Sequence, residues 1–314
     1  MDENNKYILP FPFVVRIEPA ASCNFKCIHC PTGLDMSPTG IMTLETFNKI
    51  EQELQDIIIT RGKLFRVIVL YHGGEPLLNK HFFEMVRRTK PLASMVKTVT
   101  NGSRLTDEVI DEIIRSGLEQ IEISLDGTSA QENDHIRLNP VGASFTTISA
   151  SVKKLIHRKN ELNSATPLIF ISNTQIPETI EQVQDQPKPP QFMLDVFQDV
   201  AQGITAYKSA WALVWPGLPI QVSGQPDENM CDHVINRITI RSNGDVVPCC
   251  YDLVNKMPMG NVHSERLVDI WNNKQYQNLR KDIAEYDPPE LCIGCPVLYK
   301  FKPMLKSDIF PEKC

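Results

Sequence analysis

The chain has 314 residues, of which 42% are hydrophobic and 22% charged, a composition typical of a globular protein with a large α/β domain and a smaller one. A net charge of −6 without a basic stripe argues against a nucleic-acid partner. The polar, acidic N-terminus is no signal peptide, and no run of about 18 apolar residues predicts a membrane span. Nine cysteines without a secretion signal are typical of reduced thiols and metal ligands, so we expect a cytoplasmic protein.

A cysteine-rich loop follows a short apolar run at residues 13–17. Its cysteines, Cys23, Cys27 and Cys30, are separated by three and by two residues. A structural zinc ion takes four protein ligands, so three thiolates leave zinc one ligand short. An iron–sulfur cube held by three cysteines keeps one iron free instead. The spacing taken alone also allows a partial zinc site or three unrelated buried thiols.

The next elements alternate between helix and strand. Thr43 begins a helix whose apolar residues recur at helical spacing, and residues 67–71 form a short strand rich in β-branched residues. That strand leads into Gly73, Gly74, Glu75 and Pro76. Adjacent glycines allow the backbone to approach a ligand closely, and the proline fixes the turn into the following helix. As an isolated tetrapeptide, this sequence is more often only a strand-to-helix turn.

A third strand, residues 96–100, ends at Asn101, and Thr106 begins the next helix. Residues 120–127 then alternate strictly between apolar and polar side chains. We expect the apolar set to pack beneath the outer helices of a barrel and the polar set to face its lumen. Ser124 and Asp126 would lie at the C-terminal end of this strand, where catalytic groups gather in such folds. The alternative for Asp126 is a simple turn with the glycine that follows it.

A helix at residues 146–159 and strands at residues 168–172 and 204–207 raise the total to about six β/α units. The expected fold class is therefore α/β, an open, partial (β/α)6 barrel like a TIM barrel but not closed with eight units. Trp211 and Trp215 are expected to pack rather than to line a substrate pocket. The Pro/Gly-rich residues 216–226 are expected to link a barrel domain, residues 1–215, to a small cysteine-rich domain, residues 216–314.

The six remaining cysteines lie in the last third of the chain. Residues 237–240 and 245–247 flank an Asn-Gly pair, which predicts a β-hairpin with a type I′ turn, and a helix is expected over residues 267–284. Four of these cysteines provide enough thiolates for a site with protein ligands only: Cys231, Cys249, Cys292 and Cys295. The number of ligands fits a zinc ribbon and an iron–sulfur cluster equally well.

Taken together, the N-terminal motifs resemble those of the radical S-adenosylmethionine (SAM) superfamily. The resemblance rests on the CxxxCxxC loop with His29 before its last cysteine, on the Gly-Gly-Glu-Pro turn, and on the Ser-Leu-Asp-Gly segment at residues 124–127. It implies that the first three cysteines hold a 4Fe–4S cluster whose free iron is chelated by SAM. It also implies a set of SAM-binding residues beyond the cluster, namely His29, Gly73, Gly74, Glu75, Pro76, Asn101, Ser124, Asp126 and Arg137. In that set, the backbone of residues 73–76 meets the SAM amino group, Ser124 and Arg137 hold its carboxylate, and Asp126 lies near the ribose.

The last third resembles the twitch domain, a shortened SPASM domain found after many radical SAM barrels. The matching features are Gly244 five residues before Cys249, the segments 259–261 and 270–272, and the closing CxxC. The resemblance implies a second, auxiliary 4Fe–4S cluster bound by Cys231, Cys249, Cys292 and Cys295, with Cys314 left free. Cys250 should point away from its neighbour Cys249. A packing role is expected for it, and donation of a hydrogen atom to a substrate radical is the alternative.

The resemblance implies an enzyme that cleaves SAM reductively to a 5′-deoxyadenosyl radical and abstracts a hydrogen atom from a substrate C–H bond. An electron donor such as flavodoxin or ferredoxin would be a partner. We expect dehydrogenation or epimerisation of a small hydroxylated substrate, sugar-like or aminoglycoside-like, because only 22 residues precede Cys23, too few for a leader-peptide-binding module. The alternatives are modification of a ribosomally made peptide and, in another class, a non-enzymatic zinc-binding scaffold.

Overall fold

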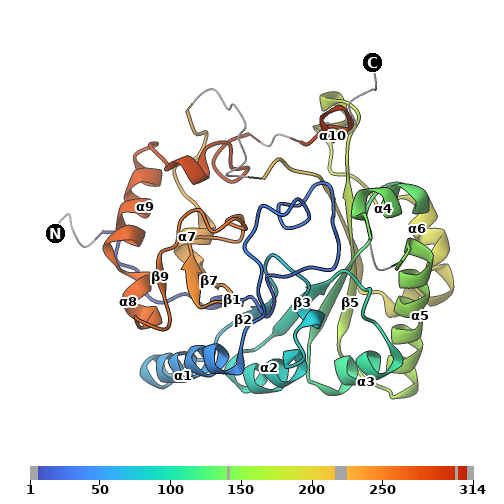
Figure 1. Ribbon diagram of the computed structural model, residues 1–314, viewed down its shortest axis with the longest axis horizontal. Coiled ribbons are helices and arrows are strands. Elements are labelled where there is room, and N and C mark those ends of the chain that lie inside the picture. The colour runs from blue at the N-terminus through green and yellow to red at the C-terminus, as the bar shows by residue number, and fades with distance from the viewer. Residues whose placement is uncertain (1–5, 140–141, 216–224, 301–302, 310–314) are drawn as a thin grey trace.

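The computed structural model describes residues 6–139, 142–215, 225–300 and 303–309 (Figure 1). It has the expected α/β fold, in which one curved nine-stranded sheet is covered on its outer side by helices. The sequence positions 216–224 of the expected linker, and Cys314, lie outside the described residues. Within the described ranges, no helix combines the length and the apolar character that a membrane span requires.

The first six strands form the partial barrel that the sequence predicts. They lie side by side in chain order, and every neighbouring pair is parallel. These strands are β1 (Val14–Ile17), β2 (Val67–Leu70), β3 (Val96–Thr100), β4 (Gln120–Ser124), β5 (Leu168–Gln175) and β6 (Ala206–Trp211). The last two differ from the expected bounds. β5 continues three residues further than predicted, and β6 begins two residues later and extends to Trp211, because residues 170–175 pair with residues 206–211.

Helices cover the outer face of this sheet, and most of them begin at a side-chain cap. Thr43 accepts a hydrogen bond from the Thr46 amide at 3.1 Å, and Thr106 accepts one from Val109 at 3.3 Å, so both predicted helix starts are confirmed. The helices of the barrel are α1 (Leu44–Arg61), α2 (Phe82–Thr89), α3 (Asp107–Arg115), α4 (Ala130–Arg137), α5 (Phe145–Glu161) and α6 (Gln191–Val196). Short 3₁₀ turns occupy Pro76–Leu78, Lys90–Leu92, Ile180–Gln184, Gln198–Gly203 and Glu290–Cys292.

The two faces of the barrel strands differ as the alternating pattern predicts. Ile121, Ile123 and Leu125 are 0% exposed and join the apolar core beneath the helices. Glu122 and Ser124 are half-buried on the opposite face, in the lumen. The sheet thus presents polar side chains toward the concave side, where the carboxyl ends of its strands meet.

The C-terminal region extends the same sheet instead of forming a separate one. β7 (Arg237–Ile240) pairs in parallel with β1, and β8 (Asp245–Val247) and β9 (Gly260–Asn261) follow in antiparallel order. The remaining helices are α7 (Asp232–Asn236), α8 (Leu267–Trp271), α9 (Lys274–Ala284) and α10 (Lys306–Ile309). The cysteine-rich region is therefore attached to the first strand of the barrel by backbone hydrogen bonds.

Two local predictions in this region are wrong. In the hairpin between β7 and β8, Gly244 has a φ of 88° but Asn243 has no positive φ, whereas a type I′ turn requires both. Arg241 and Asp245 close a loop of three residues, 242–244, because the Arg241 amide donates to the Asp245 carbonyl and the Gly244 amide donates to the Arg241 carbonyl. The helix expected over residues 267–284 is two helices, because the Asn273 side chain accepts from the Tyr276 amide at 3.0 Å and so caps a new helix.

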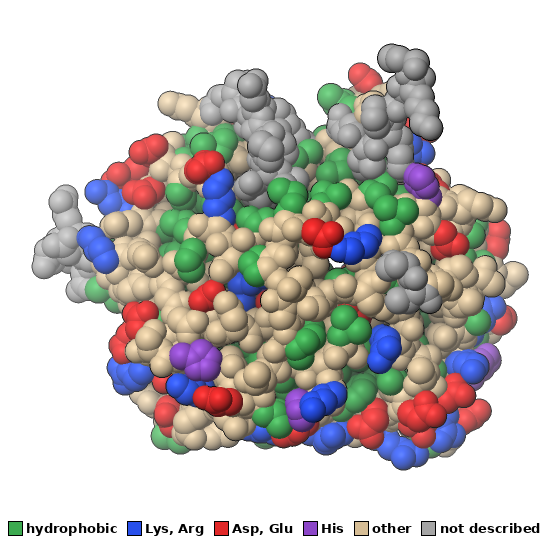
Figure 2. All heavy atoms as spheres, in the orientation of Figure 1, with side chains coloured by type: hydrophobic (Ala, Val, Ile, Leu, Met, Phe, Trp, Pro, Cys, Tyr) green, Lys and Arg blue, Asp and Glu red, His purple; other side chains and the backbone are tan. Residues whose placement is uncertain are grey.

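Charged side chains are spread without a dominant sign on the face that Figure 2 shows. Acidic and basic groups alternate along the lower edge, over α1, α2 and α3, and backbone and uncharged side chains fill most of the centre. Many surface charges form ion pairs, such as Lys154 with Asp107 and Arg87 with Glu112. On this face there is no basic stripe of the kind that binds nucleic acid.

Candidate functional site

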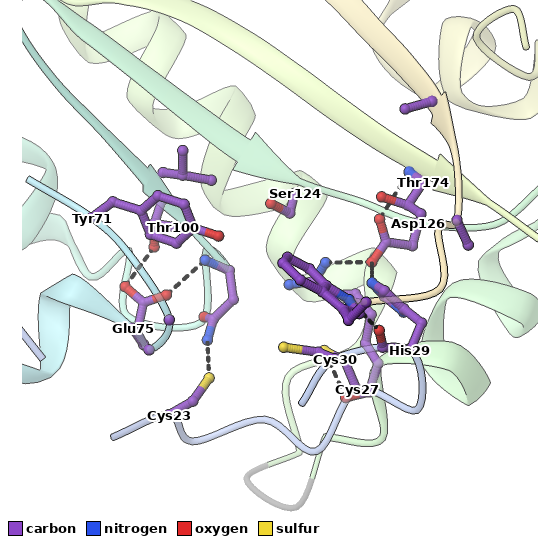
Figure 3. A pocket seen from close by; sticks show the side chains of 18 of the residues that line it. Cys23, Cys27, His29, Cys30, Tyr71, Glu75, Thr100, Ser124, Asp126 and Thr174 are labelled. Atoms are coloured by element: carbon purple, nitrogen blue, oxygen red, sulfur yellow. Dashed lines mark hydrogen bonds and ion pairs between the residues drawn. The ribbon is translucent and has the colours of Figure 1, made fainter. Parts of the chain in front are cut away.

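The three N-terminal cysteines line one pocket of about 260 Å³ at the carboxyl ends of the barrel strands (Figure 3). Their loop is fixed on the end of α4, since the amides of Lys26 and Ile28 donate to the carbonyls of Leu138 and Ile136 at 3.1 and 3.0 Å. The predicted SAM-binding residues other than Pro76 also line this pocket. Pro76 begins the 3₁₀ turn behind it.

The glycine turn after β2 packs directly against the chain that enters the cysteine loop. A Cβ on Gly74 would lie 2.4 Å from the carbonyl oxygens of Ala20 and Ser22, so only glycine fits there. The Glu75 amide donates to the Ser22 carbonyl at 2.9 Å and fixes this contact. The backbone of the turn therefore reaches the pocket next to Cys23.

The Glu75 carboxylate is buried and is used to hold the next strand. It accepts from the Thr100 hydroxyl at 2.8 Å and from the Asn101 amide at 2.7 Å. The Asn101 side chain in turn donates to Asn24 at 2.8 Å, within the cysteine loop. Burial raises the pKa of Glu75, and these hydrogen bonds oppose that rise. Glu75 and Asn101 thus join the glycine turn, β3 and the cysteine loop.

Asp126 and Arg137 form a buried ion pair on the opposite side of the pocket. Arg137 Nη1 lies 2.7 Å from Asp126 Oδ2, and the other carboxylate oxygen accepts from the Thr174 amide at 3.0 Å. His29 Nε2 lies 4.0 Å from the same carboxylate. Burial disfavours the charge of Arg137, but Asp126 and Cys27 together raise its pKa. Burial is also the main cause that lowers the pKa of His29.

Two buried nitrogen atoms at this pair have no hydrogen-bond partner among the described residues. They are Arg137 Nε and His29 Nδ1. Buried polar atoms are nearly always paired in folded proteins, so these two are available to a bound ligand. Ser124 lines the pocket beside them, and its hydroxyl accepts from Ser172 at 3.2 Å. This side of the pocket therefore fits an anionic group, which the sequence predicted as the SAM carboxylate.

The cysteine thiols fit an iron–sulfur cluster. Burial raises the pKa of Cys27 to about 12 and also raises that of Cys23, so a bound metal is needed to hold their thiolates. Within the described part of the chain, no three His, Cys, Asp or Glu side chains converge as ligands of a single metal ion. Cluster ligands are spread over separate irons and need no such convergence.

Aromatic side chains that the sequence did not assign to the site form much of its wall. Tyr71, Trp211 and Trp215 line the pocket, so the expectation that both tryptophans only pack is wrong. Trp215 Nε1 donates to the His29 carbonyl at 2.8 Å, which ties it to the cysteine loop. The positions of Tyr71 and Trp211 in the sequence could have identified them as pocket residues, because they lie at the carboxyl ends of β2 and β6, where functional side chains gather in such barrels.

The C-terminal cysteines come together in a second group. Burial is the main cause that raises the pKa of Cys249, and the nearby thiols of Cys250, Cys292 and Cys295 raise it further. Cys231 likewise raises the pKa of Cys292 and of Cys295. The Cys295 amide donates to Cys292 at 3.1 Å in the tight turn of the CxxC. These thiols are also a donor set suited to an iron–sulfur cluster.

The Cys250 thiol lies 3.6 Å from His233 Nδ1. Three aromatic rings continue from there toward the first cysteine loop. The His233 ring is 5.5 Å from Tyr251, and Tyr251 is 5.8 Å from Trp215. Cys250 is not among the residues that line the pocket of the first three cysteines.

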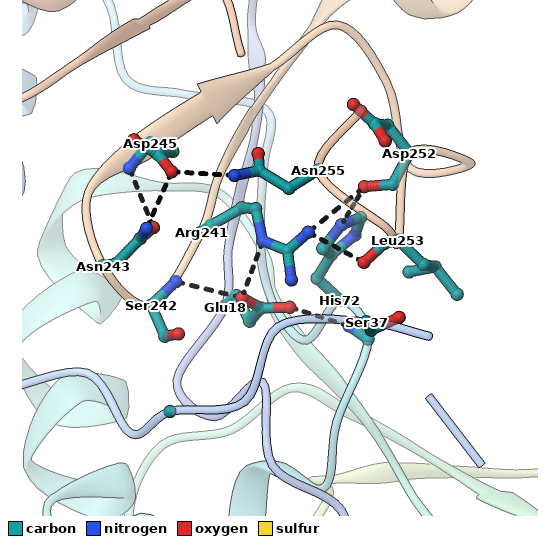
Figure 4. Close-up of polar contacts among 12 residues, drawn as sticks. Glu18, Ser37, His72, Arg241, Ser242, Asn243, Asp245, Asp252, Leu253 and Asn255 are labelled. Atoms are coloured by element: carbon teal, nitrogen blue, oxygen red, sulfur yellow. Dashed lines mark hydrogen bonds and ion pairs between the residues drawn. The ribbon is translucent and has the colours of Figure 1, made fainter. Parts of the chain in front are cut away.

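A buried carboxylate joins the glycine turn to the C-terminal hairpin (Figure 4). Glu18 follows β1, and its oxygens accept from the amides of Gly73 at 3.1 Å and Ser242 at 3.0 Å. Arg241 Nε lies 3.5 Å from the same carboxylate, and Arg241 Nη1 donates to the Leu253 carbonyl at 2.8 Å. The segment after Cys249 and Cys250 is thus connected to the pocket through side chains that the sequence did not single out.

The chain is similar along most of its length to several known proteins. The chain is 25% identical over 316 residues to the tungsten-containing aldehyde ferredoxin oxidoreductase cofactor-modifying protein of Pyrococcus furiosus, covering 89% of this chain and 86% of the relative. It is 23% identical to the PqqA peptide cyclase of Xanthomonas campestris, covering 92% and 80%. Its fold is similar to that of native anSMEcpe with bound AdoMet and Cp18Cys peptide, with a TM-score of 0.56, 15% identity and 96% of both chains covered.

Two family models match the chain. The model of the radical SAM superfamily matches residues 17–183, which is more than half of the chain, and contains all of the pocket's cysteines. The model of the iron–sulfur cluster-binding domain SPASM matches residues 231–296, from Cys231 to just beyond Cys295. The chain therefore belongs to the radical SAM superfamily, with a C-terminal SPASM region, and uses S-adenosylmethionine and iron–sulfur clusters as cofactors.

Proposed function

We propose that this chain is a radical SAM oxidoreductase that dehydrogenates a peptide substrate. The observation that carries the proposal is the single pocket in which three thiols, a glycine turn and the Asp126–Arg137 pair meet an aromatic wall. When bound, the N-terminal cluster and SAM supply a 5′-deoxyadenosyl radical that abstracts a hydrogen atom from the substrate. The residues of the chain bind and orient the reactants and exclude water.

The roles of individual residues follow from their positions. Cys23, Cys27 and Cys30 would hold the N-terminal cluster. The backbone of Gly73 and Gly74 would receive the amino group of SAM, because no side chain separates that backbone from the pocket. These assignments agree with the position of the glycine turn next to Cys23.

Arg137 would receive the carboxylate of SAM through its unpaired Nε, while Asp126 keeps the guanidinium in place from its other side. His29 would provide its unpaired Nδ1 at the same wall. Glu75 and Asn101 would act by holding the glycine turn and the cysteine loop in register.

A peptide is supported as the substrate by the printed functions of similar proteins. PqqA peptide cyclase is named for a peptide, and the anSMEcpe structure holds one. The expectation of a small hydroxylated substrate rested on the few residues before Cys23. That reasoning loses its force, because the anSMEcpe chain is covered to 96% by this chain and accommodates a peptide.

The second cysteine group supports dehydrogenation as the reaction class. Cys231, Cys249, Cys292 and Cys295 would bind an auxiliary cluster, which would accept the second electron from the substrate radical. The network of Glu18 and Arg241 connects the glycine turn beside the first cysteine loop to the hairpin before Cys249 through buried side chains. A reduced flavodoxin or ferredoxin would supply the electron that cleaves SAM, and its oxidised form would take back the electron from the auxiliary cluster. The substrate radical would release its proton to solvent as the double bond forms.

The experiment that tests this proposal begins with anaerobic purification and reconstitution. Two 4Fe–4S clusters give about eight irons per chain, a brown protein, and 5′-deoxyadenosine that forms only with a reductant. The variant with Cys23, Cys27 and Cys30 all replaced by alanine should keep half of the iron and lose SAM cleavage.

The alternatives give different results in the same assays. A zinc-binding scaffold would be colourless, hold zinc and leave SAM intact, and that outcome would refute the enzyme. Continued formation of 5′-deoxyadenosine by the triple variant would refute the assignment of the N-terminal cluster. A peptide library and a panel of hydroxylated small molecules, each followed by mass spectrometry for a loss of two hydrogens, separate the two substrate classes.

A further inference from the structure

The lumen of the partial barrel carries an excess of positive charge directly beneath the pocket. The strand pairing places these charges, because side chains that pair in register share one face of a sheet. Arg16 pairs with Val69, and Val69 pairs with Lys97, so Arg16 and Lys97 belong to one row across the first three strands. Val15 and Ile17, on the other face of β1, are 0% exposed beneath the helices. Arg16 and Lys97 therefore lie on the lumen face.

The same register adds three charged residues from the other strands. Glu122 pairs with Val99 of β3, which lies two residues beyond Lys97 on the same face. Lys208 pairs with Ser172, a neighbour of Ser124 across β4 and β5. Arg237 of β7 pairs with Val14 of β1, two residues before Arg16. Four cations and one carboxylate thus share this part of the lumen.

Among the described residues, two of these four cations have no ion-pair partner. Lys208 is paired with Glu122, and Arg237 with Asp232 at 2.6 Å. Near the pocket, Glu18 is already paired with Arg241. In the described parts of the chain, no carboxylate forms an ion pair with Arg16 or with Lys97. Half-buried cations without an anion are unfavourable, so this arrangement costs stability unless a ligand supplies the negative charge.

The surroundings of Lys97 show the effect of this excess. Burial is the main cause that lowers its pKa, and the nearby charges of Lys208 and Arg16 lower it further. Glu122 acts in the opposite direction and Arg237 adds to the lowering. The positive charges therefore act on one another across the lumen.

The two unpaired cations lie next to the pocket wall. Arg16 Nη1 donates to the Tyr71 carbonyl at 3.2 Å, and its guanidinium lies 5.8 Å from the Tyr71 ring. Tyr71 itself lines the pocket together with the three thiols. Val99, also in the pocket lining, is two residues beyond Lys97, a separation of about 7 Å along a strand. Arg16 and Lys97 do not line the pocket themselves, but each lies next to a residue of its wall, Arg16 next to Tyr71 and Lys97 two residues before Val99.

We infer that the substrate carries a carboxylate that enters the lumen and pairs with Arg16 and Lys97. Given the peptide substrate proposed above, on which this inference rests for its reaction, the substrate is an acidic peptide segment. The guanidinium suits a planar carboxylate, which it binds through two parallel hydrogen bonds, and the ammonium adds a second point of attraction. The aromatic wall of Tyr71, Trp211 and Trp215 favours a large apolar residue next to the acidic one.

The test measures binding, so it does not depend on turnover. Two probes, N-acetyl-glutamyl-phenylalanine amide and its glutaminyl counterpart, are titrated by calorimetry into the reconstituted enzyme with SAM. The acidic probe should bind at least tenfold more tightly than the neutral one. Arg16→Met and Lys97→Met should each remove most of this preference, whereas Lys154→Met, an exposed lysine on α5, should retain it.

Several outcomes overturn the inference. One is equal binding of the two probes, and another is an unchanged preference for the acidic probe in both lumen variants. The third is stronger competition by inorganic phosphate than by N-acetylglutamate, which would show that the lumen binds a phosphate group instead of a carboxylate. Thermal unfolding distinguishes a ligand site from a structural role. Lys97→Met should melt at or above the wild-type temperature, because it removes repulsion, and a clear fall would show that Lys97 supports the fold instead.

The failure of this inference is separable from the failure of the proposed function. Enzyme that forms 5′-deoxyadenosine but shows no preference for the acidic probe retains the proposed function and loses the acidic substrate. Enzyme that prefers the acidic probe but never cleaves SAM retains the carboxylate site and loses the proposed reaction.

Discussion

Glu18 and Arg241 form an ion pair with less than 3% of either side chain exposed, although 223 positions separate them in the sequence. Glu18 also accepts the amide of Gly73, in the turn that lines the pocket, and Arg241 holds the segment after the C-terminal cysteine pair (Figure 4). One buried contact therefore connects the glycine turn to the SPASM region.

Replacing Glu18 with glutamine should destabilise the fold by about 3–5 kcal/mol, because it leaves the buried Arg241 without its carboxylate. Urea unfolding of the metal-loaded protein measures this change. Asp107→Asn, which breaks the exposed pair with Lys154, is the matched control and should cost no more than about 1 kcal/mol. Equal effects of the two substitutions would contradict a special role for the buried pair.

A chain that ends at Trp215 should aggregate. It lacks β7, which pairs with β1 over four residues, and so exposes the edge of β1 along the sheet. Solubility and size-exclusion chromatography after expression measure the outcome, with a chain ending at residue 309 as the control that keeps β7. A soluble, monomeric barrel from the shorter chain would show that residues 1–215 fold as an independent domain.

Cys250→Ala tests whether this thiol donates a hydrogen atom. The thiol lies against His233 and is not part of the pocket lining, so we expect the variant to keep turnover and to give the same oxidised product. The reaction is run in deuterated buffer beside the wild type, and the products are compared by mass spectrometry. Solvent deuterium in the wild-type product, lost together with turnover in the variant, would instead establish an epimerase with Cys250 as the donor.

The stability of the protein should fall as the pH decreases from about 6.5 toward 4. Burial, with Arg237 and Arg16, lowers the pKa of His233 to about 4, whereas an unfolded histidine titrates near 6.5. Between these two values the unfolded chain therefore binds more protons than the folded chain. The contribution of neutral His233 to the free energy of unfolding is fully present only above about pH 6.5 and is lost as the pH falls toward 4.

Unfolding curves of wild type and His233→Asn, measured across this pH range, show whether stability falls at low pH and whether His233 causes the fall. The variant should show a smaller loss of stability at low pH, and His81→Asn, a half-exposed histidine beside Glu84, should behave like wild type. Iron content is measured at each pH so that only loaded protein is compared. A variant curve parallel to that of wild type would rule out His233 as the titrating group.

The sequence by itself determined the order of the elements and grouped the cysteines into two candidate sets of metal ligands. Thr43 and Thr106 cap helices because their hydroxyls bond to amides three residues away, and the alternation of Ile121, Glu122 and Ile123 separates core from lumen. These are local properties, governed by spacing along the chain. The cysteine spacings and the glycine turn are local in the same way, and their resemblance to the motifs of the radical SAM superfamily predicted the class of enzyme.

Only the tertiary structure decided which distant residues meet. The pairing of β1 with β7, the contact of Glu18 with Arg241 and the entry of Trp215 into the pocket wall each join segments far apart in the sequence, and no local pattern encodes such partners. The unpaired cations of the lumen are also visible only in three dimensions. Whether a charged side chain has a partner depends on the register of neighbouring strands, which the tertiary fold sets.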